Sequence, residues 1–316
     1  MALGFFRRLA SILRKREESR ISRLVNDPSL PYLVDRDDIV KEFFAVLREE
    51  ALLPDKGRMD RLASDLGYIL EKGAIPGSLY TISLMTLSRS RKEPGDPISR
   101  DGFLRAVDEV AEVYSRIRDI VVDEASKVIG YNATVLTYGY SSFVKDVLVF
   151  SKAKVNRVIS LDQSPLLSGR KMVLELRREG LKAIYYPDMM AMWASIEADM
   201  VLVEVLGVSE GHAILDIGAL PLVETALSRG IPVYLVTNDF TLVPMPSLQE
   251  IMKRYRLDLT RFDSMYHRFI YGFDALDLGS KEGVYIISSL GTLRSNAEAV
   301  NMVKAKLLEG QKPLNI

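Results

Sequence analysis

Three ionisable side chains in the C-terminal half are candidates for proton transfer: His212, Asp216 and Asp239. Acid–base pairs and metal sites often combine a histidine with carboxylates. Their spacing matches no pattern of metal ligands, and a single loop histidine is most often a polar surface residue. Asp216 would alternatively cap the helix that follows it. The sequence therefore predicts no metal ion, no cofactor and no catalytic residue.

The segment after the first predicted strand has the residue types of an anion site. Residues 137–142 read TYGYSS, in which Gly139 and Tyr140 precede Ser141 and Ser142 at a predicted helix start. A glycine lets the backbone approach a ligand, and the N–H groups of a helix start attract anions. Ser141 or Ser142 would donate to a phosphate; alternatively, Ser141 is the N-cap of the helix. Neither a G-x-G-x-x-G fingerprint nor a Walker A sequence is present.

A second candidate segment follows the next predicted strand. Residues 162–171 read DQSPLLSGRK, which places Ser164 and Gly169 before the cations Arg170 and Lys171. These cations would contact an anionic ligand at the helix start. Alternatively, they only face solvent in the first turn of the helix. The candidate ligand pocket therefore contains Gly139, Tyr140, Ser141, Ser142, Ser164, Gly169, Arg170, Lys171, His212, Asp216 and Asp239.

These residues share a pocket only if the strands before them lie parallel in one sheet. Short runs rich in β-branched residues predict strands at residues 133–137, 157–161, 183–186, 200–205, 233–237 and 284–288. Helices are predicted at residues 141–151, 167–179, 189–195, 218–228 and 248–255. This alternation predicts a parallel sheet covered on both faces. Ligands bind beyond the carboxyl ends of such strands, here residues 137–142, 162–169, 186–190, 204–218 and 237–241.

The first 130 residues have a different pattern. Apolar residues recur at helical spacing, which predicts a first helix ending near residue 25 and others at residues 37–52, 59–71, 79–87 and 101–127. The fold class is thus α/β, with a helical N-terminal domain (residues 1–130) followed by a Rossmann-like parallel-sheet domain (residues 131–316). We expect the helical pattern to end near Gly130 and the sheet to start near Ala133.

Charge and targeting signals limit the classes of partner. The 316-residue chain has 42 basic and 42 acidic side chains, so its zero net charge gives no argument for nucleic acid or an anionic membrane. Residues 1–20 have a short, basic, amphipathic pattern, predicted as a surface helix rather than a signal peptide or membrane span. A helix lying on a membrane is the alternative. The absence of cysteine excludes a thiol nucleophile. It fits a reducing compartment, or a hot one where thermolabile residues are avoided, and we expect a cytoplasmic protein.

Five segments, taken in order, resemble the α/β/δ subunit family of translation initiation factor 2B. That family shares its fold with ribose-1,5-bisphosphate isomerase and methylthioribose-1-phosphate isomerase. The segments are VLTYGYS at 135–141, DQSPLLSG at 162–169, EADMVLV at 197–203, GHAILDIGA at 211–219 and PVYLVTNDF at 232–240. The resemblance covers residues 103–240 and implies the family's fold and pairing of subunits through the α/β domain.

The chain departs from the isomerases where their chemistry lies. Their cysteine and aspartate correspond to Gly139 and His212, and their asparagine and lysine to Leu215 and Asp216. The arginine that is typical before the proline is Ser164. An isomerase needs a positioned acid and base, and bound phosphates need cations. We therefore expect no isomerase activity on either substrate.

The leading interpretation is a non-catalytic, initiation factor 2B-like regulatory or scaffold protein of protein biosynthesis that acts through protein–protein contacts. A remnant pocket for a sugar phosphate or nucleotide is compatible with it. The alternatives are a sugar-phosphate isomerase with altered catalytic residues and a non-catalytic sensor of a phosphorylated small molecule. The resemblance implies translation initiation factor 2 as a partner and a homodimer or larger homo-oligomer. The apolar residues 269–273 would supply an interface core.

Overall fold

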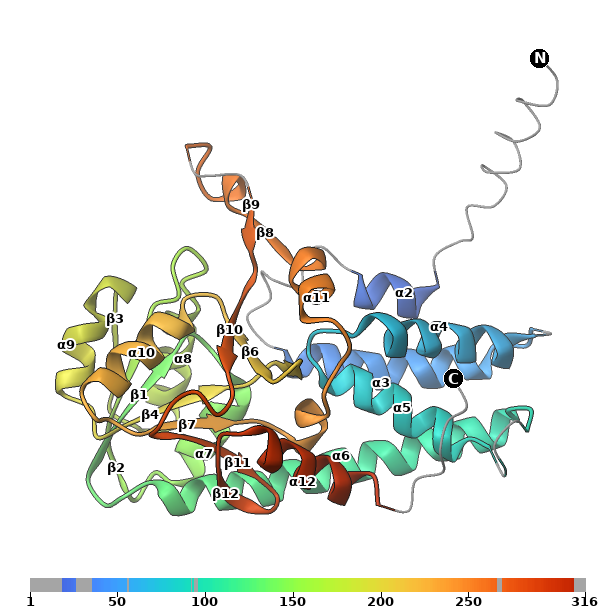
Figure 1. The fold of residues 1–316 in the computed structure, drawn as a ribbon, viewed down its shortest axis with the longest axis horizontal. Helices are drawn as coiled ribbons and strands as arrows, with labels where there is room; N and C mark the ends of the chain where they lie inside the picture. Colours follow the sequence, from blue (N-terminus) through green and yellow to red (C-terminus); the bar gives the residue numbers. More distant parts are fainter. Residues whose placement is uncertain are drawn as a thin grey trace.

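The computed structural model describes residues 19–26, 36–55, 57–91, 93, 96–265 and 269–309. The amphipathic pattern predicted at residues 1–20 lies almost wholly outside them. A helical part ends at Val128 and an α/β part begins at Ala133, so the predicted change of pattern is confirmed. The helices of the first part lie along one side of the second (Figure 1). Among these described residues, no helix is both long and apolar enough to cross a membrane.

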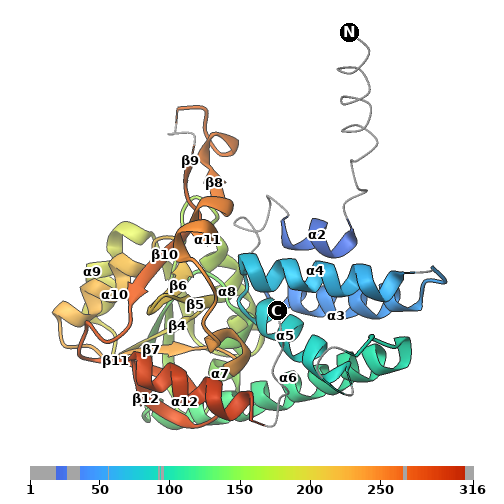
Figure 2. The same cartoon turned by 45° about the vertical axis from the view of Figure 1, so that its right-hand side comes forward.

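The helical part is built from amphipathic helices whose apolar faces meet. Its helices are α2 (Arg20–Val25), α3 (Asp37–Leu52), α4 (Arg58–Lys72), α5 (Ser78–Arg89) and α6 (Arg100–Val128). In α3, Ile39, Phe43 and Leu47 recur at four-residue steps and are all buried, which places them on one helix face. Helix α6 begins after Ser99, whose hydroxyl accepts from the Gly102 N–H at 3.1 Å. It runs from the helical part to beneath the sheet (Figure 2).

A seven-stranded sheet forms the centre of the α/β part, in the order β12-β11-β7-β4-β1-β2-β3. Its strands are β1 (Ala133–Tyr138), β2 (Val155–Leu161), β3 (Ala183–Tyr186), β4 (Met200–Glu204), β7 (Val233–Val236), β11 (Val284–Ser288) and β12 (Gly291–Arg294). All neighbours are parallel except β11 and β12. The chain moves from β1 outward to β3 and returns to β4 on the other side of β1. The carboxyl ends of β1 and β4 therefore flank the point where the strand order reverses, the usual ligand position in open α/β sheets.

Helices cover both faces of this sheet. They are α7 (Ser142–Phe150), α8 (Ser168–Arg178), α9 (Ala191–Ile196), α10 (Ala219–Ser228) and α12 (Ala297–Leu307). Helix α11 (Leu248–Arg254) lies beside the end of α4 instead, and the chain also forms the 3-10 turns η2 (Asp188–Met190), η3 (Asp239–Leu242) and η4 (Leu259–Arg261). Val135 belongs to one apolar core with residues of α6, α7 and α8, whereas Leu136 belongs to a second with residues of α9, α10 and α12. Alternate side chains of one strand thus enter opposite cores. The predicted α/β, Rossmann-like fold class is confirmed.

The short strands outside the central sheet depart from the sequence-based expectation. Strands β5 (Gly207–Ser209), β6 (His212–Asp216) and β10 (Phe273–Asp277) form an antiparallel sheet, and β8 (Arg256–Asp258) pairs with β9 (Phe269–Tyr271). Residues 207–216 are therefore a hairpin rather than a loop, because Glu210 and Gly211 both adopt positive φ and form its two-residue turn. In the apolar segment 269–273, Phe273 is buried in the core, whereas Phe269 and Tyr271 are exposed.

Candidate functional site

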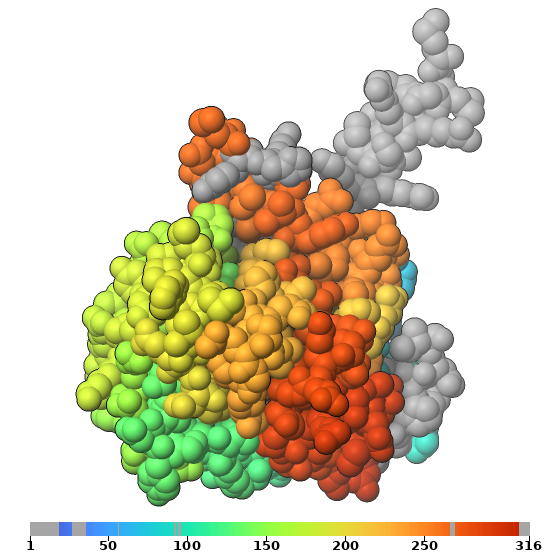
Figure 3. Space-filling view, turned by 60° about the vertical axis from the view of Figure 1, so that its left-hand side comes forward, coloured from blue at the N-terminus to red at the C-terminus, as the bar shows by residue number. Residues whose placement is uncertain are grey.

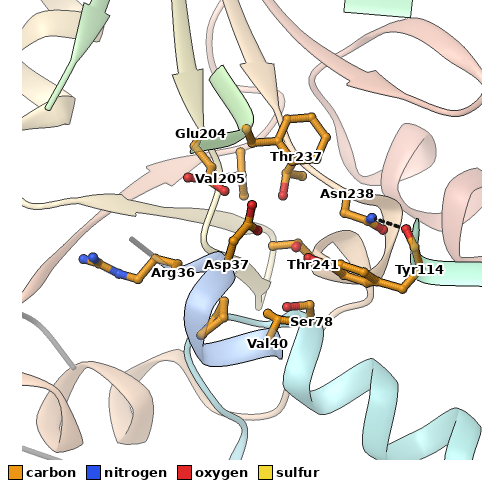
Figure 4. Close-up of a pocket in the computed structure, with 12 residues that line it drawn as sticks. Arg36, Asp37, Val40, Ser78, Tyr114, Glu204, Val205, Thr237, Asn238 and Thr241 are labelled. Atoms are coloured by element: carbon orange, nitrogen blue, oxygen red, sulfur yellow. Dashed lines mark hydrogen bonds between the residues drawn. The ribbon is translucent and has the colours of Figure 1, made fainter. Parts of the chain in front are cut away.

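A crevice beyond the carboxyl ends of β4 and β7 is lined by both parts of the chain. Its other lining residues come from the beginnings of α3, α5 and α7, from η3 and from Tyr114 of α6 (Figure 4). Asn238 donates through Nδ2 to the Tyr114 carbonyl at 2.9 Å, which ties the end of β7 to α6. The crevice therefore combines the carboxyl edge of a parallel sheet with helix beginnings, two features that favour ligand binding.

Glu204, the last residue of β4, lies in this crevice beside Asp37 (Figure 4). Burial, and then the Asp37 carboxylate, raise the pKa of Glu204 to about 8, although a hydrogen bond with Ser141 opposes the shift. The carboxyl group is therefore mostly protonated at neutral pH. A protonated carboxyl group donates as well as accepts hydrogen bonds, which suits it to a position beside another acid.

Asp37, the first residue of α3, joins three helices. Its Oδ2 accepts from the Ser142 hydroxyl of α7 at 2.6 Å and lies 2.6 Å from Nη1 of Arg118 in α6. Arg118 also contacts Asp146 at 2.8 Å, and its guanidinium lies 4.5 Å from the centroid of the Phe143 ring. The positive charge at this end of the crevice is thus already shared between two carboxylates and an aromatic face.

The residue before α3 forms a second ion pair. Arg36 donates through Nη2 to Asp216 Oδ1 at 2.8 Å, and only 5% and 15% of the two side chains are exposed. Asp216 ends β6, so this pair joins the helical part to the small antiparallel sheet. The isomerases that the sequence resembles carry a lysine at the position of Asp216. Here a cation reaches the same place from Arg36 and is neutralised by Asp216.

These contacts leave little room in the crevice. The space enclosed by its lining is about 10 Å³, which holds about one water molecule. Pockets for small organic ligands usually enclose roughly 300–1,000 Å³. A phosphorylated sugar therefore fits only if side chains of the lining move aside.

Three residues of the predicted pocket lie in or beside this crevice: Ser141, Ser142 and Asp216. Ser141 accepts from the Val144 N–H at 3.0 Å, so it is the N-cap of α7, as the alternative interpretation expected. It also forms a hydrogen bond with Glu204, which adds a contact in the crevice to its capping role. Ser142 is held by its hydrogen bond to Asp37, and Asp216 by its ion pair with Arg36.

Gly139 and Tyr140 are held by the turn before α8. Gly139 has a φ of 59°, and a Cβ there would lie 2.4 Å from Oε1 of Gln163. Tyr140 donates its N–H to Ser168 Oγ at 3.0 Å and its hydroxyl to Glu175 at 2.9 Å. Both residues therefore contact the β2–α8 segment, and neither lines the crevice.

The two predicted cations of α8 are held by neighbouring side chains. Arg170 lies 3.3 Å from Asp162, and the Lys171 ammonium lies 3.9 Å from the centroid of the Tyr140 ring. These contacts favour the alternative interpretation, in which this is the first turn of a helix and not an anion site.

Ser164 and Gly169 shape the turn between β2 and α8. Ser164 is exposed and donates its N–H to Asp188 Oδ2 at 2.6 Å. Gly169 is buried, and a Cβ there would lie 2.1 Å from the Leu161 carbonyl oxygen. The glycine is therefore required by the close approach of α8 to β2.

His212 and Asp239 do not line the crevice. His212 begins β6 and Asp216 ends it, so about 13 Å of extended chain separates them. His212 Nδ1 lies 2.9 Å from the Glu210 carbonyl oxygen. Asp239 is buried and accepts from the N–H of Ser289, beyond β11, at 2.9 Å. In the part of the chain that the structure describes, no group of three or more His, Cys, Asp or Glu side chains could hold a metal ion.

Sequence reasoning does not single out four residues of this site: Arg36, Asp37, Arg118 and Glu204. Glu204 carries one local signal, because it is the first ionisable residue after the apolar run 200–203 of a predicted strand. Asp37 and Arg118 come from helices of the N-terminal part, and Arg36 directly precedes α3. Arg36 is 180 residues from Asp216 in the sequence, and no local pattern predicts that pairing.

The sequence profile of the initiation factor 2 subunit family matches residues 78–269. This range is more than half of the chain. It begins at α5 and includes strands β1 to β8, so it contains the sheet edge that forms the crevice.

Solved structures share the fold over nearly the whole chain. The translation initiation factor eIF-2B of Pyrococcus horikoshii aligns with a TM-score of 0.68 and 18% identity, over 93% of this chain and 98% of that one. A chain of the tetrameric eIF2B-beta2-delta2 complex of C. thermophilum gives 0.65 and 15%, over 94% and 97%. Subunit delta of eIF-2B from A. fulgidus gives 0.55 and 16%, over 90% and 92%. At these identities the likeness is one of fold alone.

Proposed function

The chain belongs to the initiation factor 2 subunit family, and we propose that it acts in translation initiation as a non-catalytic regulatory or scaffold protein of the cytoplasm. It acts through protein–protein contacts. The observation that carries this proposal is the filled crevice, where about 10 Å³ remain and where the charged lining residues Arg36 and Asp37 are already paired with Asp216 and Arg118. A protein whose expected substrate position is occupied by its own ion pairs is better suited to binding partners on its surface.

The turn after β1 supports the same proposal. The related isomerases carry a cysteine at the position of Gly139, whose φ of 59° is a conformation that residues with side chains rarely adopt. A Cβ there would also lie 2.8 Å from Ser168 Oγ. The turn is therefore suited to a residue without a side chain, and so to a protein without a nucleophile at this position.

Capture of initiation factor 2 from a native lysate tests the proposed partner. The full chain, carrying an affinity tag, should retain initiation factor 2, and the purified factor should then bind the purified chain directly. The control bait is a tagged α/β protein of similar size and net charge. If the chain captures initiation factor 2 from lysate but does not bind the purified factor, the contact between them is indirect. No binding in either experiment would contradict the proposed partner.

The crevice also favours a second candidate function, a sensor of a phosphorylated small molecule. The guanidinium group of Arg36 lines it and that of Arg118 lies beside it, paired with Asp37, and both would contact a phosphate if their carboxylate partners moved aside. A ligand at 100 times its dissociation constant adds about 2.7 kcal/mol to the free energy of unfolding. A thermal-shift panel of sugar phosphates and nucleotides therefore separates a sensor from a scaffold.

Isomerase chemistry is the remaining alternative, and assays with ribose 1,5-bisphosphate and methylthioribose 1-phosphate test it. Glu204 is the crevice group best suited to proton transfer, since its pKa of about 8 is close to neutral. We expect no turnover, because Asp37, the acid beside Glu204, is already engaged by Ser142 and Arg118, which leaves the proton transfer without its second member. Turnover that is lost in Glu204→Gln or in His212→Ala would contradict the proposed function.

A further inference from the structure

Basic side chains gather at the amino edge of the central sheet, the edge opposite the crevice. Residues 151–154 precede β2 and residues 178–182 precede β3, and together they contain four basic side chains and one acidic one. The chain as a whole has equal numbers of the two. Figure 3 turns this side of the molecule forward, with the end of α6 in green at its lower edge. A local excess of positive charge in a neutral chain directs an anionic partner to one surface.

Hydrogen bonds of the main chain hold these segments side by side. Strands β1, β2 and β3 are neighbours in the sheet. At their beginnings, Ala133 donates its N–H to the Lys154 carbonyl at 3.2 Å, and Val158 donates to the Lys182 carbonyl at 2.8 Å. Neighbouring strands lie about 4.8 Å apart, so the segments before the three strands follow one another over about 10 Å.

Two lysines of this edge are anchored and keep their charge. Lys152 donates through Nζ to the Glu179 carbonyl at 2.7 Å, and Lys154 to the Ser126 carbonyl at 2.9 Å. Both carbonyls lie at the ends of helices, α8 and α6, where cations often serve only as caps. An ammonium group has three donors, and in each lysine the capping bond uses one of them. The exposed Lys152 can therefore cap α8 and contact an anion at the same time.

Arg178 and Lys182 are not explained by capping. Both side chains are exposed, and in the described part of the chain neither forms a hydrogen bond or an ion pair. Glu179 lies between them in the sequence and is the only acidic residue of the two segments. The two cations are thus free to bind a partner outside the chain.

The acidic side chains on the flank of these segments already have partners. Asp123 and Glu124 lie 3.0 and 2.6 Å from the Lys127 ammonium. Asp199 accepts from the Thr134 N–H at 2.7 Å. These carboxylates therefore do not neutralise the two free cations.

Two aromatic rings are exposed beside these cations. Tyr131, in the turn before β1, is 86% exposed, and Phe150, the last residue of α7, is 61% exposed. Phe150 lies two residues before Lys152. Tyr131 lies two residues before Ala133, which is bonded to Lys154. Exposed rings next to cations are typical of surfaces for single-stranded nucleic acids, in which cations contact phosphates and rings stack on bases.

We propose that single-stranded RNA binds to this amino-edge patch, which is formed by Tyr131, Phe150, Lys152, Lys154, Arg178 and Lys182. The cations contact the phosphates, and the two rings stack on unpaired bases, which a duplex does not offer. The choice of RNA over DNA rests on the proposed function in translation initiation, whereas the choice of a single strand rests on the patch alone. The patch and the crevice lie at opposite ends of the parallel strands, so the two sites are separate.

Fluorescence anisotropy of a labelled oligouridylate of about 12 nucleotides, titrated with the full chain, tests the proposal. Each phosphate contact contributes about −0.7 to the slope of log K against log salt for a single strand. Three or four contacts therefore predict a slope of about −2 to −3 between about 50 and about 200 mM salt. No binding, a slope near zero, or equal binding of the matching RNA duplex would overturn the proposal.

Matched variants locate the binding surface. Arg178→Gln should weaken binding and make the salt slope shallower by about 0.7, whereas Arg105→Gln, on α6, should change neither. Both arginines are exposed and, among the described residues, without a side-chain partner. Tyr131→Ala should weaken binding ~5- to ~150-fold, the usual range for one stacked base. Its control is Tyr271→Ala, at a tyrosine that is 50% exposed, which should have no effect. Equal effects within either pair would overturn the proposal.

Other classes of anionic partner predict different results. A patch for an acidic protein segment would lose affinity for the oligouridylate with Arg178→Gln and not with Tyr131→Ala. A patch for an anionic membrane would bind phosphatidylserine vesicles and not the oligouridylate. Either result would overturn the proposal, as would tighter binding of the matching oligodeoxyuridylate.

Failure of this surface and failure of the proposed function give different results. A chain that binds the oligouridylate through Arg178 and Tyr131 but captures no initiation factor 2 supports the patch and contradicts the proposed partner. A chain that binds the purified factor but not the oligouridylate supports the partner and contradicts the patch.

Discussion

Glu204 is a carboxylic acid in a place that disfavours its ionised form, and this gives a testable pH dependence. Burial, and then Asp37, raise its pKa from 4.5 to about 8, so the folded chain retains a proton that the unfolded chain releases. The stabilisation linked to this proton is fully present below about pH 4.5 and is lost as the pH rises to about 8. We expect Glu204→Gln to abolish this loss, which amounts to a few kcal/mol. Urea unfolding at about pH 5 and about pH 9 measures it.

The control for this change is Glu224→Gln, because Glu224 is a surface residue whose partner is Lys281. It should keep the pH dependence of the natural chain. If Glu204→Gln also kept that dependence, the Glu204 carboxyl group would be ionised in the crevice, which would contradict a protonated Glu204 beside Asp37.

Asp216 determines whether the crevice still recognises phosphate. Asp216→Lys removes the partner of a buried arginine and places a second cation beside it, which should lower the free energy of unfolding by about 3–5 kcal/mol. The same two cations should bind a phosphorylated sugar more tightly than the natural chain does. Isothermal titration with ribose 1,5-bisphosphate measures the gain. No gain would mean that the crevice is no longer a phosphate site, which favours the scaffold over the sensor.

A charge swap is the control for Asp216→Lys. The double variant Arg36→Asp with Asp216→Lys restores an ion pair across the 2.8 Å contact, with the acid at position 36 and the base at position 216. The double variant should recover part of the lost stability and should lose the added phosphate binding, because its net charge in the crevice returns to that of the natural chain.

At the scale of elements, the strands that carry the crevice follow from the sequence and the small strands do not. Strands β4 and β7 start where predicted and end one residue earlier, because a central strand buried on both faces needs consecutive apolar residues. Strands β5 and β8 have three residues each, too few for a period of two to be recognised. The predicted residues that lie in or beside the crevice, Ser141, Ser142 and Asp216, all belong to segments that follow a predicted strand.

At Gly139, in the turn from β1 to α7, an added side chain would cause both backbone strain at positive φ and close contacts, and a comparison with Gly211 separates the two effects. Gly139→Ala adds a Cβ at positive φ and into contact with Gln163 and Ser168, whereas Gly211→Ala adds one at positive φ with nothing within 4 Å. Both should lower the free energy of unfolding by about 1–2 kcal/mol through backbone strain. The contacts should make the loss larger at Gly139. Equal losses in chemical denaturation would show that the Gln163–Ser168 turn moves aside, and that a side chain is tolerated where the isomerases carry theirs.

For the whole molecule, the division into domains of residues 1–130 and 131–316 remains a proposal, and the packing indicates that they unfold together. One apolar core contains Phe43 and Phe103 of the helical part with Val135 and Val158 of the sheet. The Arg36–Asp216 pair links the same two parts. If the two parts separated, each would expose apolar residues that it now buries against the other. The calorimetric and van 't Hoff enthalpies of unfolding should therefore agree for the natural chain.

Phe240 lies at this junction and provides the sharpest test of it. It is fully buried, its ring lies 5.3 Å from that of Tyr114, and its carbonyl accepts from the Thr81 hydroxyl at 2.7 Å. Phe240→Ala should lower the free energy of unfolding by about 3–5 kcal/mol. Phe150→Ala, the same change at a residue that is 61% exposed, should cost less than about 0.5 kcal/mol. Because the two parts share one core, the destabilised Phe240→Ala variant should still unfold in a single transition at a lower temperature. Two separate calorimetric transitions in that variant would mean that each part is stable alone and that the shared core only joins them.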